Sequence, residues 1–212
     1  MAERAPFAGS DAWLPPEPLI LASTSPTRRL LLENAGLRIA CRAPDVDERL
    51  LEAGFVGHRP GEVALRLAEA KASSVARRCP GQVVVGADQV LALDGEILHK
   101  PADPAEAASQ LARLSGRTHI LHSAVALASD GVVVDRFVET ACLTLRALDA
   151  GAIATYVALA GPERVTASVG GYQLEGLGIH LFHRIEGDHT TILGLPLLPL
   201  LDRLRARGWL RF

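Results

Sequence analysis

VVVGADQVLALDGEIL, residues 83–98, predicts a buried strand that leads into a hairpin. Its first three residues are apolar and β-branched, as in strands that are covered on both faces. Residues 86–89 follow this strand at its carboxyl end. Residues 90–93 and 96–98 then form the arms of a hairpin around Asp94-Gly95, a dipeptide favoured in two-residue turns. We therefore expect the polar residues Asp88 and Gln89 to emerge from the interior of a sheet.

Helical and extended segments alternate on both sides of this stretch. Upstream, the pattern predicts a strand at 19–22, a helix at 26–34 that stops at Gly36, and a helix at 60–78. Downstream, it predicts a helix at 104–114, strands at 120–127 and 132–144, and helices at 150–159 and 199–207. Strands that alternate with helices, with some hairpins between them, indicate an α/β fold built on a mixed sheet.

Length and composition are those of one folded domain. The chain has 212 residues, of which 49% are hydrophobic and 22% are charged. The first 18 residues are rich in proline and lack the basic start and apolar stretch of a secretory signal. We expect residues 1–18 to be a flexible tail and residues 19–212 to be a single domain.

Charge, hydropathy and cysteine usage exclude several classes of partner and site. A net charge of -2 and 4% aromatic residues supply neither a basic field nor stacking platforms for a nucleic-acid polymer. The longest apolar run, 192–201, is interrupted by two prolines and is shorter than the roughly 20 residues that a membrane span needs. Cys41, Cys79 and Cys142 are odd in number and form no CxxC pair, which argues against a zinc site and fits a reducing cytosol.

Residues 23–29, STSPTRR, have the composition of an anion site. The hydroxyls of Ser23 and Ser25 and free backbone N–H groups lie where a helix begins, and Arg28 and Arg29 follow at once. Helix N-termini bind phosphate through unpaired N–H groups, and arginine adds bidentate bonds. The alternative is that Ser25 only caps the helix while the arginines are solvated.

Asp88 is the second candidate. A carboxylate that directly follows a buried strand is a candidate catalytic group, although aspartate at such a place often only caps a turn. Lys71 or Lys100 could bring an ammonium group beside it. Glu48, in the acidic cluster 45–48, could hold a divalent ion or could be merely solvated.

Other suggestive residues fit structural roles better. His119 and His122 have the spacing of an HxxH metal pair, but in a strand their side chains point to opposite faces, and the same holds for His180 and His183. The glycines at 170–178 do not form GxGxxG, and Gly116 does not open a P-loop. Neither a Rossmann cofactor nor a Walker-type nucleotide site is indicated.

Six short motifs occur in order along the chain: STSPTR (23–28), LAxxKA (67–72), GADQV (86–90), KP (100–101), LSG (114–116) and GLP (194–196). Together they resemble the Maf family of nucleoside triphosphate pyrophosphatases, over about residues 19–208. The resemblance implies a cytoplasmic, metal-dependent enzyme that cleaves a nucleotide between its α and β phosphates. It also implies a Maf/ITPase-like fold, an elongated mixed sheet flanked by helices, with two lobes around a substrate cleft.

The resemblance implies roles for individual residues. Phosphate binding falls to residues of the first motif, namely Ser23, Ser25, Arg28 and Arg29. The implied catalytic residues are Asp88, Lys71 and Lys100. The implied ligands of a divalent cation (Mg²⁺, Mn²⁺ or Co²⁺) are Glu48 and Asp88. The implied partner is a nucleoside triphosphate, and a homodimer stays open.

Thr27, Gln89 and Glu175 look like the positions that separate a 7-methyl-GTP subgroup of this family from a dTTP/UTP subgroup. A carboxylate accepts hydrogen bonds from guanine N1–H and N2–H₂, and its negative charge favours the positively charged 7-methylguanine ring. We therefore expect 7-methyl-GTP as substrate. The alternatives are a dTTP/UTP pyrophosphatase and a nucleotide-binding regulator of septum formation without significant turnover.

Overall fold

The structure, a computed structural model, describes residues 12–53 and 57–212. Its strands are β1 (Leu19–Ala22), β2 (Ile39–Cys41), β3 (Val83–Leu93), β4 (Glu96–Leu98), β5 (Thr118–Ser129), β6 (Val132–Leu145) and β7 (Phe182–Glu186). Its helices are α1 (Pro26–Asn34), α2 (Glu48–Ala53), α3 (Pro60–Ala76), α4 (Pro104–Leu114), α5 (Ala150–Ala160), α6 (Pro162–Ala167), α7 (His189–Ile192) and α8 (Leu197–Ala206). Two short 3₁₀ helices are η1 (Val169–Gly171) and η2 (Leu177–Leu181).

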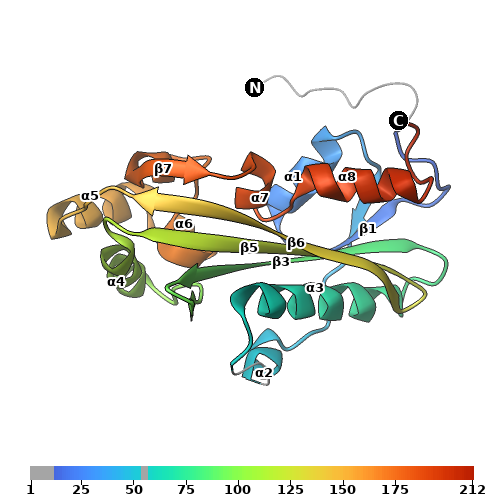
Figure 1. Ribbon diagram of the computed structural model, residues 1–212, viewed down its shortest axis with the longest axis horizontal. Helices are drawn as coiled ribbons and strands as arrows, with labels where there is room; N and C mark the ends of the chain where they lie inside the picture. The colour runs from blue at the N-terminus through green and yellow to red at the C-terminus, as the bar shows by residue number, and fades with distance from the viewer. Residues whose placement is uncertain (1–11, 54–56) are drawn as a thin grey trace.

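The strands form one mixed sheet that runs along the length of the molecule (Figure 1). Their order is β2-β1-β3-β5-β6-β7, and β4 pairs with β3 off this path. β1 is parallel to both of its neighbours, whereas the other pairs are antiparallel. The expected α/β fold with a mixed sheet and flanking helices is confirmed.

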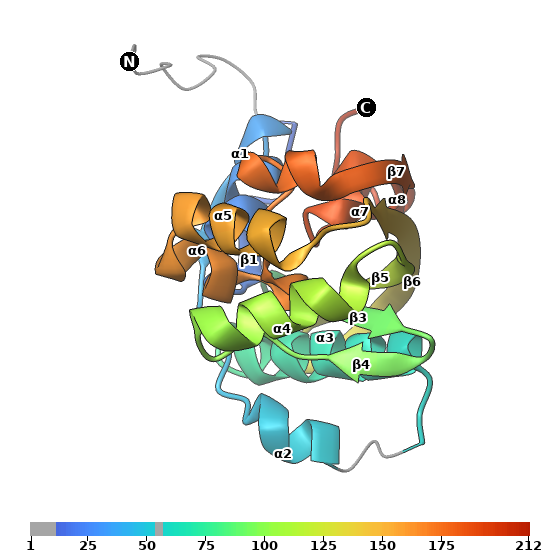
Figure 2. The same cartoon turned by 90° about the vertical axis from the view of Figure 1, so that its left-hand side faces the viewer.

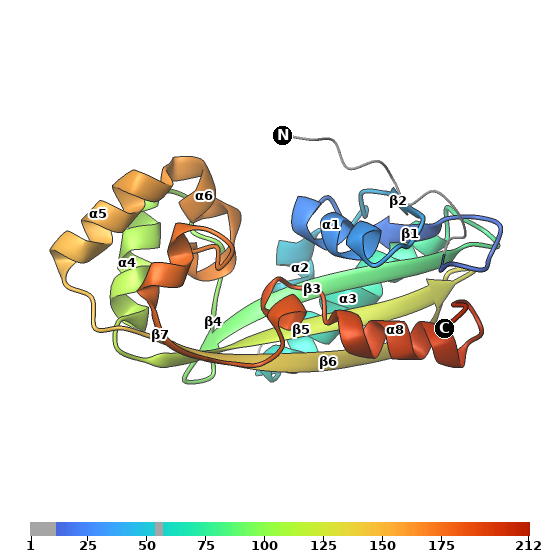
Figure 3. The ribbon, with the colours of Figure 1, turned by 90° about the horizontal axis from the view of Figure 1, so that it is seen from above.

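Alternate residues of the strands point to opposite faces of the sheet and build separate cores. On one face, Leu21 and Val85 pack with apolar residues of α1 and α8. On the other face, Ile20 and Val84 lie beneath α3. At the far end of the long strands, Leu91 belongs to a third core with α4, α5 and α6. Figure 3 shows these helices gathered at one end of the sheet and α1, α3 and α8 toward the other, and Figure 2 looks along the sheet from the end that carries α4, α5 and α6.

β3 is longer than the sequence pattern predicts, and this corrects the expected place of Asp88. The strand runs through Gly86, Asp88 and Gln89 without a break, so Asp88 lies in its middle and does not cap a turn. Gly86 permits this because α3 passes directly over it: a Cβ atom there would lie 2.3 Å from the carbonyl oxygen of Ala68. Glycine is therefore required where helix and strand meet.

Several short elements have no counterpart in the sequence pattern. β2, β7, α6 and α7 fall in segments for which the pattern predicts neither a helix nor a strand. Glu48 lies in the first turn of α2 and not in an acidic loop. These elements have three to six residues, too few for a periodic signal.

The amino-terminal segment needs a second correction. Residues 1–11 lie outside the described residues, but residues 12–18 are not a flexible tail. Trp13 is 2% exposed and pairs with Leu210 in an isolated bridge. Its ring lies 6.3 Å from that of Trp209, and its Nε1 donates to the carbonyl oxygen of Glu17. The segment is thus held against the carboxyl terminus.

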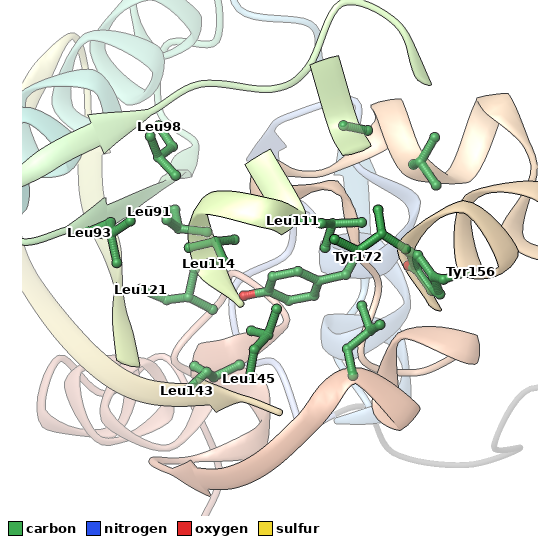
Figure 4. Close-up of a cluster of buried hydrophobic side chains, with 14 of the residues drawn as sticks. Leu91, Leu93, Leu98, Leu111, Leu114, Leu121, Leu143, Leu145, Tyr156 and Tyr172 are labelled. Atoms are coloured by element: carbon green, nitrogen blue, oxygen red, sulfur yellow. The ribbon is translucent and has the colours of Figure 1, made fainter. Parts of the chain in front are cut away.

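The third core contains a buried polar pair. His119 in β5 is fully buried, and its Nε2 lies 2.6 Å from the hydroxyl oxygen of Tyr172. The Tyr172 ring packs edge-on against Phe182, and Figure 4 shows it among Leu111, Leu114 and Leu145. Within the described chain, neither histidine of the HxxH spacing belongs to a group of three side chains that could hold a metal ion.

This histidine predicts a pH-dependent stability. Burial lowers the pKa of His119 from 6.5 to about 4, so between these values the unfolded chain binds a proton that the folded chain does not. The stabilisation is complete above pH 6.5 and is lost as the pH falls toward 4. We expect wild type to lose about 2 kcal/mol of unfolding free energy between pH 7.5 and pH 5 relative to His119→Phe. Urea titrations of both proteins at both pH values measure this difference. Equal losses of unfolding free energy in wild type and His119→Phe would contradict the prediction.

Candidate active site

A cavity of about 910 Å³ lies between the two ends of the molecule. It is lined by residues 23–28 at the start of α1, by Glu48, Lys71, Asp88 and Gln89, by residues 97–100 at the end of β4 and just beyond it, and by residues 167–169 and 172–175. Its wall thus combines elements from both ends of the long strands. The cavity brings together most of the residues that the motifs single out.

The first motif forms the amino-terminal end of α1. The Ser23 hydroxyl accepts from the backbone N–H of Ser25, and the Ser25 hydroxyl accepts from the N–H of Arg28. Ser25 is therefore the N-cap, with Pro26 in the first turn. The first turn has no acidic residue, so the positive end of the helix dipole faces the cavity without a counter-charge from its own turn.

The guanidinium group of Arg28 is hydrogen-bonded within the protein, contrary to the alternative in which both arginines are solvated. Its Nε donates to the carbonyl oxygen of Gly194 at 2.8 Å, and its Nη1 donates to that of Ala87 at 2.8 Å. Burial lowers the pKa of its guanidinium, and the charges of Asp88 and Glu48 oppose that shift. Arg28 therefore connects α1, β3 and the segment before α8, and it contributes positive charge to the cavity.

Arg29 lies apart from this group. It is exposed, and its Nε pairs with Glu33 one helical turn later at 2.7 Å. It is absent from the cavity wall. The structure does not bring Arg29 to the site at which the first motif predicts phosphate binding.

Lys71 joins two carboxylates in the cavity. Its Nζ lies 2.5 Å from Asp88 Oδ1 and 3.0 Å from Glu48 Oε1. Lys71 and Asp88 are buried, whereas the Glu48 side chain is 50% exposed. Lys71 projects from α3, and the close approach at Gly86 places that helix within reach of β3. Of the two lysines considered as partners for Asp88, Lys71 is the one in contact.

The charges around Asp88 act in opposite directions. Burial raises the pKa of Asp88, while the positive charges of Lys71 and Arg28 lower it and the Glu48 charge adds to the rise. A carboxyl group whose pKa lies above its ordinary value is a better proton acceptor than an exposed one.

Both lysines of the chain lie in this cavity. The sequence contains 22 cationic residues of the Lys and Arg types, of which Lys71 and Lys100 are the two lysines. Lys100 is exposed on the cavity wall, in the loop that follows β4. A buried and an exposed ammonium group therefore face the same space.

A divalent cation is compatible with the carboxylates present. Asp88 and Glu48 converge on one ammonium group, and carboxylate oxygens are the ligands that Mg²⁺ and Mn²⁺ prefer. Within the described ranges there is no cluster of three acidic, histidine or cysteine side chains that could hold a metal. Two protein carboxylates would therefore need phosphate oxygens and water to complete the coordination shell, as is usual for Mg²⁺.

The three predicted specificity positions also line the cavity. Thr27 is half-buried, and Glu175 is exposed. Gln89 is held from its amide end: Nε2 lies 2.9 Å from Ser123 Oγ and 3.0–3.1 Å from the carbonyl oxygens of Thr191 and Ile192. Its amide protons are thus occupied by the protein, which leaves the carbonyl Oε1 as its polar atom for other partners.

Two residues of the site, Ser123 and Tyr172, lie outside the sequence motifs. Ser123 is fully buried opposite Gln89 in the sheet register, and its hydroxyl donates to the Thr191 carbonyl oxygen at 2.7 Å. Tyr172 lines the cavity, as Glu175 does. Their contacts join segments 34 to 68 residues apart, so no local pattern could have revealed them.

Comparison with known proteins finds a family model and relatives that match most of the chain. A family model described as Maf-like protein matches residues 18–207. A nucleoside triphosphate pyrophosphatase of Nitrobacter winogradskyi is 52% identical over 198 residues, 93% of this chain and 97% of that protein. A 7-methyl-GTP pyrophosphatase of Rhizobium johnstonii is 54% identical over 192 residues, 90% of this chain and 96% of that protein. Another 7-methyl-GTP pyrophosphatase, from Mesorhizobium japonicum, is 54% identical over 194 residues, 91% and 97% of the two chains.

Two further observations concern membrane-spanning helices and the cysteines. Among the described residues, no helix is both long and apolar enough to span a bilayer. Cys41, Cys79 and Cys142 are free thiols.

Proposed function

The chain belongs to the Maf family, and from this premise we propose that it hydrolyses nucleoside triphosphates between the α and β phosphates. The products are a nucleoside monophosphate and pyrophosphate. The observation that carries the proposal is the contact of Lys71 with Asp88 and Glu48, in a cavity that also receives the amino-terminal end of α1.

The phosphate chain binds by neutralisation of its charge. Backbone N–H groups at the start of α1 and the ammonium groups of Lys71 and Lys100 face the cavity. Arg28 adds positive charge close to Asp88, while its own hydrogen bonds hold the walls of the site together. Positioning and charge neutralisation account for most of the acceleration in phosphoryl-transfer reactions.

Asp88 acts as the general base in the hydrolytic step. An attacking water transfers a proton to the Asp88 carboxylate as its oxygen forms a bond to the α-phosphorus. The bond from that phosphorus to the bridging oxygen breaks, and pyrophosphate leaves with the electron pair. The ammonium group of Lys71 orients the carboxylate through its contact with Oδ1.

Asp88 and Glu48 would also hold a divalent cation, Mg²⁺, Mn²⁺ or Co²⁺. When bound, such an ion supplies Lewis-acid stabilisation of the negative charge on the phosphates. Because Lys71 contacts the same two carboxylates, its ammonium group maintains the geometry of both side chains.

We propose 7-methyl-GTP as the preferred substrate. Glu175 and the Gln89 carbonyl oxygen are both acceptors, which suits a purine edge that carries N1–H and N2–H₂ donors. A pyrimidine edge has two carbonyl acceptors, which would be left without donors there. The names of the relatives from Rhizobium and Mesorhizobium support this choice.

We expect a specificity constant for 7-methyl-GTP at least about tenfold above those for dTTP and UTP. Glu175→Gln should narrow the preference, because the amide adds a donor for a pyrimidine carbonyl while the phosphate contacts stay intact. Pyrophosphate release from a panel of nucleotides with Mg²⁺, Mn²⁺ or Co²⁺ measures both effects.

Glu163→Gln is the matched control, since Glu163 is exposed on α6 and absent from the cavity wall. It should keep the wild-type preference. A wild-type enzyme that turns over dTTP or UTP faster than 7-methyl-GTP would place the chain in the alternative subgroup. Absence of pyrophosphate from every nucleotide would support a binding protein without turnover.

A further inference from the structure

His119 lies in an apolar core, where an apolar side chain would need no hydrogen bonds but a histidine does. The residue is fully buried, and its Nδ1 is a buried nitrogen without a hydrogen-bond partner among the described residues. An unpaired buried polar atom costs stability. Packing alone therefore does not explain a histidine here. Its side chain makes a 2.6 Å hydrogen bond to the Tyr172 hydroxyl.

Tyr172 connects this buried pair to the cavity. It is 5% exposed and yet contributes to the cavity wall, so one part of the side chain lies in the core and another faces the site. Two glycines with positive φ precede it, Gly170 at 78° and Gly171 at 74°. A Cβ at Gly170 would lie 2.7 Å from Leu91 Cδ1, and one at Gly171 would lie 3.3 Å from Ala107 Cβ. The backbone before Tyr172 is therefore closely packed against β3 and α4.

The same segment ends at the predicted base-recognition residue. Glu175 follows Tyr172 by three residues and lies in a turn in which the Gly176 N–H donates to the Gln173 carbonyl oxygen. This turn is tight, because a Cβ at Gly178 would lie 2.3 Å from that oxygen. The turn is joined to the core through Tyr172, which is 5% exposed, and through Leu174, which packs against the same core. Of these two side chains, Tyr172 is the one that makes a hydrogen bond to His119.

We propose that His119 is a positioning residue for base recognition: its hydrogen bond fixes Tyr172, and Tyr172 fixes the turn that presents Glu175 to the nucleobase. This inference rests on the proposed function, since it assigns a determinant of base selection at the same site. It places that determinant in the core of the helical end of the molecule, remote from the phosphate-binding residues. Tyr156 supports the same segment, as its hydroxyl donates to the Gly171 carbonyl oxygen at 3.2 Å.

The test compares His119→Phe, Tyr172→Phe and the double variant with wild type. Each single change should raise KM for 7-methyl-GTP about fivefold, the change that corresponds to one neutral hydrogen bond. The preference over UTP should narrow by the same factor, while kcat stays within about twofold because the groups around Asp88 are untouched. The double variant should show the effect of one single change, because both remove the same bond.

Thermal unfolding separates positioning from folding stability. In the double variant both polar partners are apolar, which leaves no unpaired buried group of this pair. Its melting temperature should therefore equal or exceed that of Tyr172→Phe, while its KM stays raised. A double variant that regained wild-type KM along with stability would overturn the proposal, because the selectivity loss would then follow from stability alone.

His122→Phe is the matched control, since His122 is on the same strand but on the opposite face of the sheet. It should leave the ratio of specificity constants unchanged. Wild-type KM and selectivity in both single variants would show that the pair only fills the core, with the pyrophosphatase assignment intact. A wild-type protein that releases no pyrophosphate from any nucleotide would overturn the proposed function and this inference together.

Discussion

Asp88→Asn is expected to reduce the turnover of nucleoside triphosphates by about 10²- to 10⁴-fold, the range for loss of a general base. Asparagine keeps the volume of the side chain, and its carbonyl oxygen can still accept from Lys71 Nζ, but the amide cannot take a proton from water. Glu48 remains as a second partner for Lys71, so the ammonium group is not left without a carboxylate. Initial rates of pyrophosphate release and the affinity for the triphosphate measure the two parts of this expectation.

Asp135→Asn provides the matched control. Asp135 pairs with Arg203 and Arg207 at 3.6 and 3.4 Å and does not line the cavity. It undergoes the same chemical change and should keep wild-type turnover. If Asp88→Asn turned over substrate at a near wild-type rate, Asp88 would not act in the chemical step. A lower melting temperature without a specific loss of rate would assign it a structural role.

Lys71→Met is expected to lower kcat/KM by about 10²- to 10³-fold, the loss seen when one donor is removed from a preorganised site. Methionine has a similar length and stays compatible with the helix, but it leaves the buried Asp88 carboxylate without its closest cation. Affinity for the triphosphate should fall more than affinity for the monophosphate, because the lost charge faces the phosphate chain. Calorimetric titration with both ligands and circular dichroism of the variant provide the measurement.

Arg66→Met is a suitable control, as Arg66 is an exposed cation on the same helix. It should retain both the rate and the difference between the two affinities. Equal losses for monophosphate and triphosphate in Lys71→Met would indicate that recognition depends on the base and that Lys71 mainly supports Asp88.

Much of the fold could be predicted from local patterns, and the exceptions have physical causes. The long helices α3 and α4 and the hairpin at Asp94-Gly95 have periodic or turn signals, and the structure contains them. The strand through Asp88 was predicted too short, because Gly86 and Asp88 interrupt its apolar pattern. Both residues are there for reasons other than strand formation: one admits α3, and the other bears a buried charge. Sites of this kind are where local consistency is expected to fail.

The candidate site shows the same division. Residue types made Asp88, Lys71 and Ser25 candidates, and the resemblance to the Maf family implied their roles. The structure brings all three to one cavity. Spacing could not reveal that Arg28 would bond to the carbonyl oxygen of Gly194, 166 residues away. It also could not show that Arg29, next to it, turns outward to Glu33. Such choices depend on which helical face meets the sheet, and that is decided by packing between distant segments.

Because both lysines lie in the cavity, their chemical reactivity can report whether a ligand is bound there. Apart from the chain terminus, its primary amines are those of Lys71 and Lys100, and all other cations of the Lys and Arg types carry guanidinium groups that acylating reagents do not modify at neutral pH. Both amines lie in one cavity, and Lys100 is the exposed one. Acylation of Lys100, followed by mass spectrometry, would thus report ligand protection without an engineered label. Conversely, coupling to an amine-reactive surface would tend to obstruct the cavity, so immobilisation through another group is preferable.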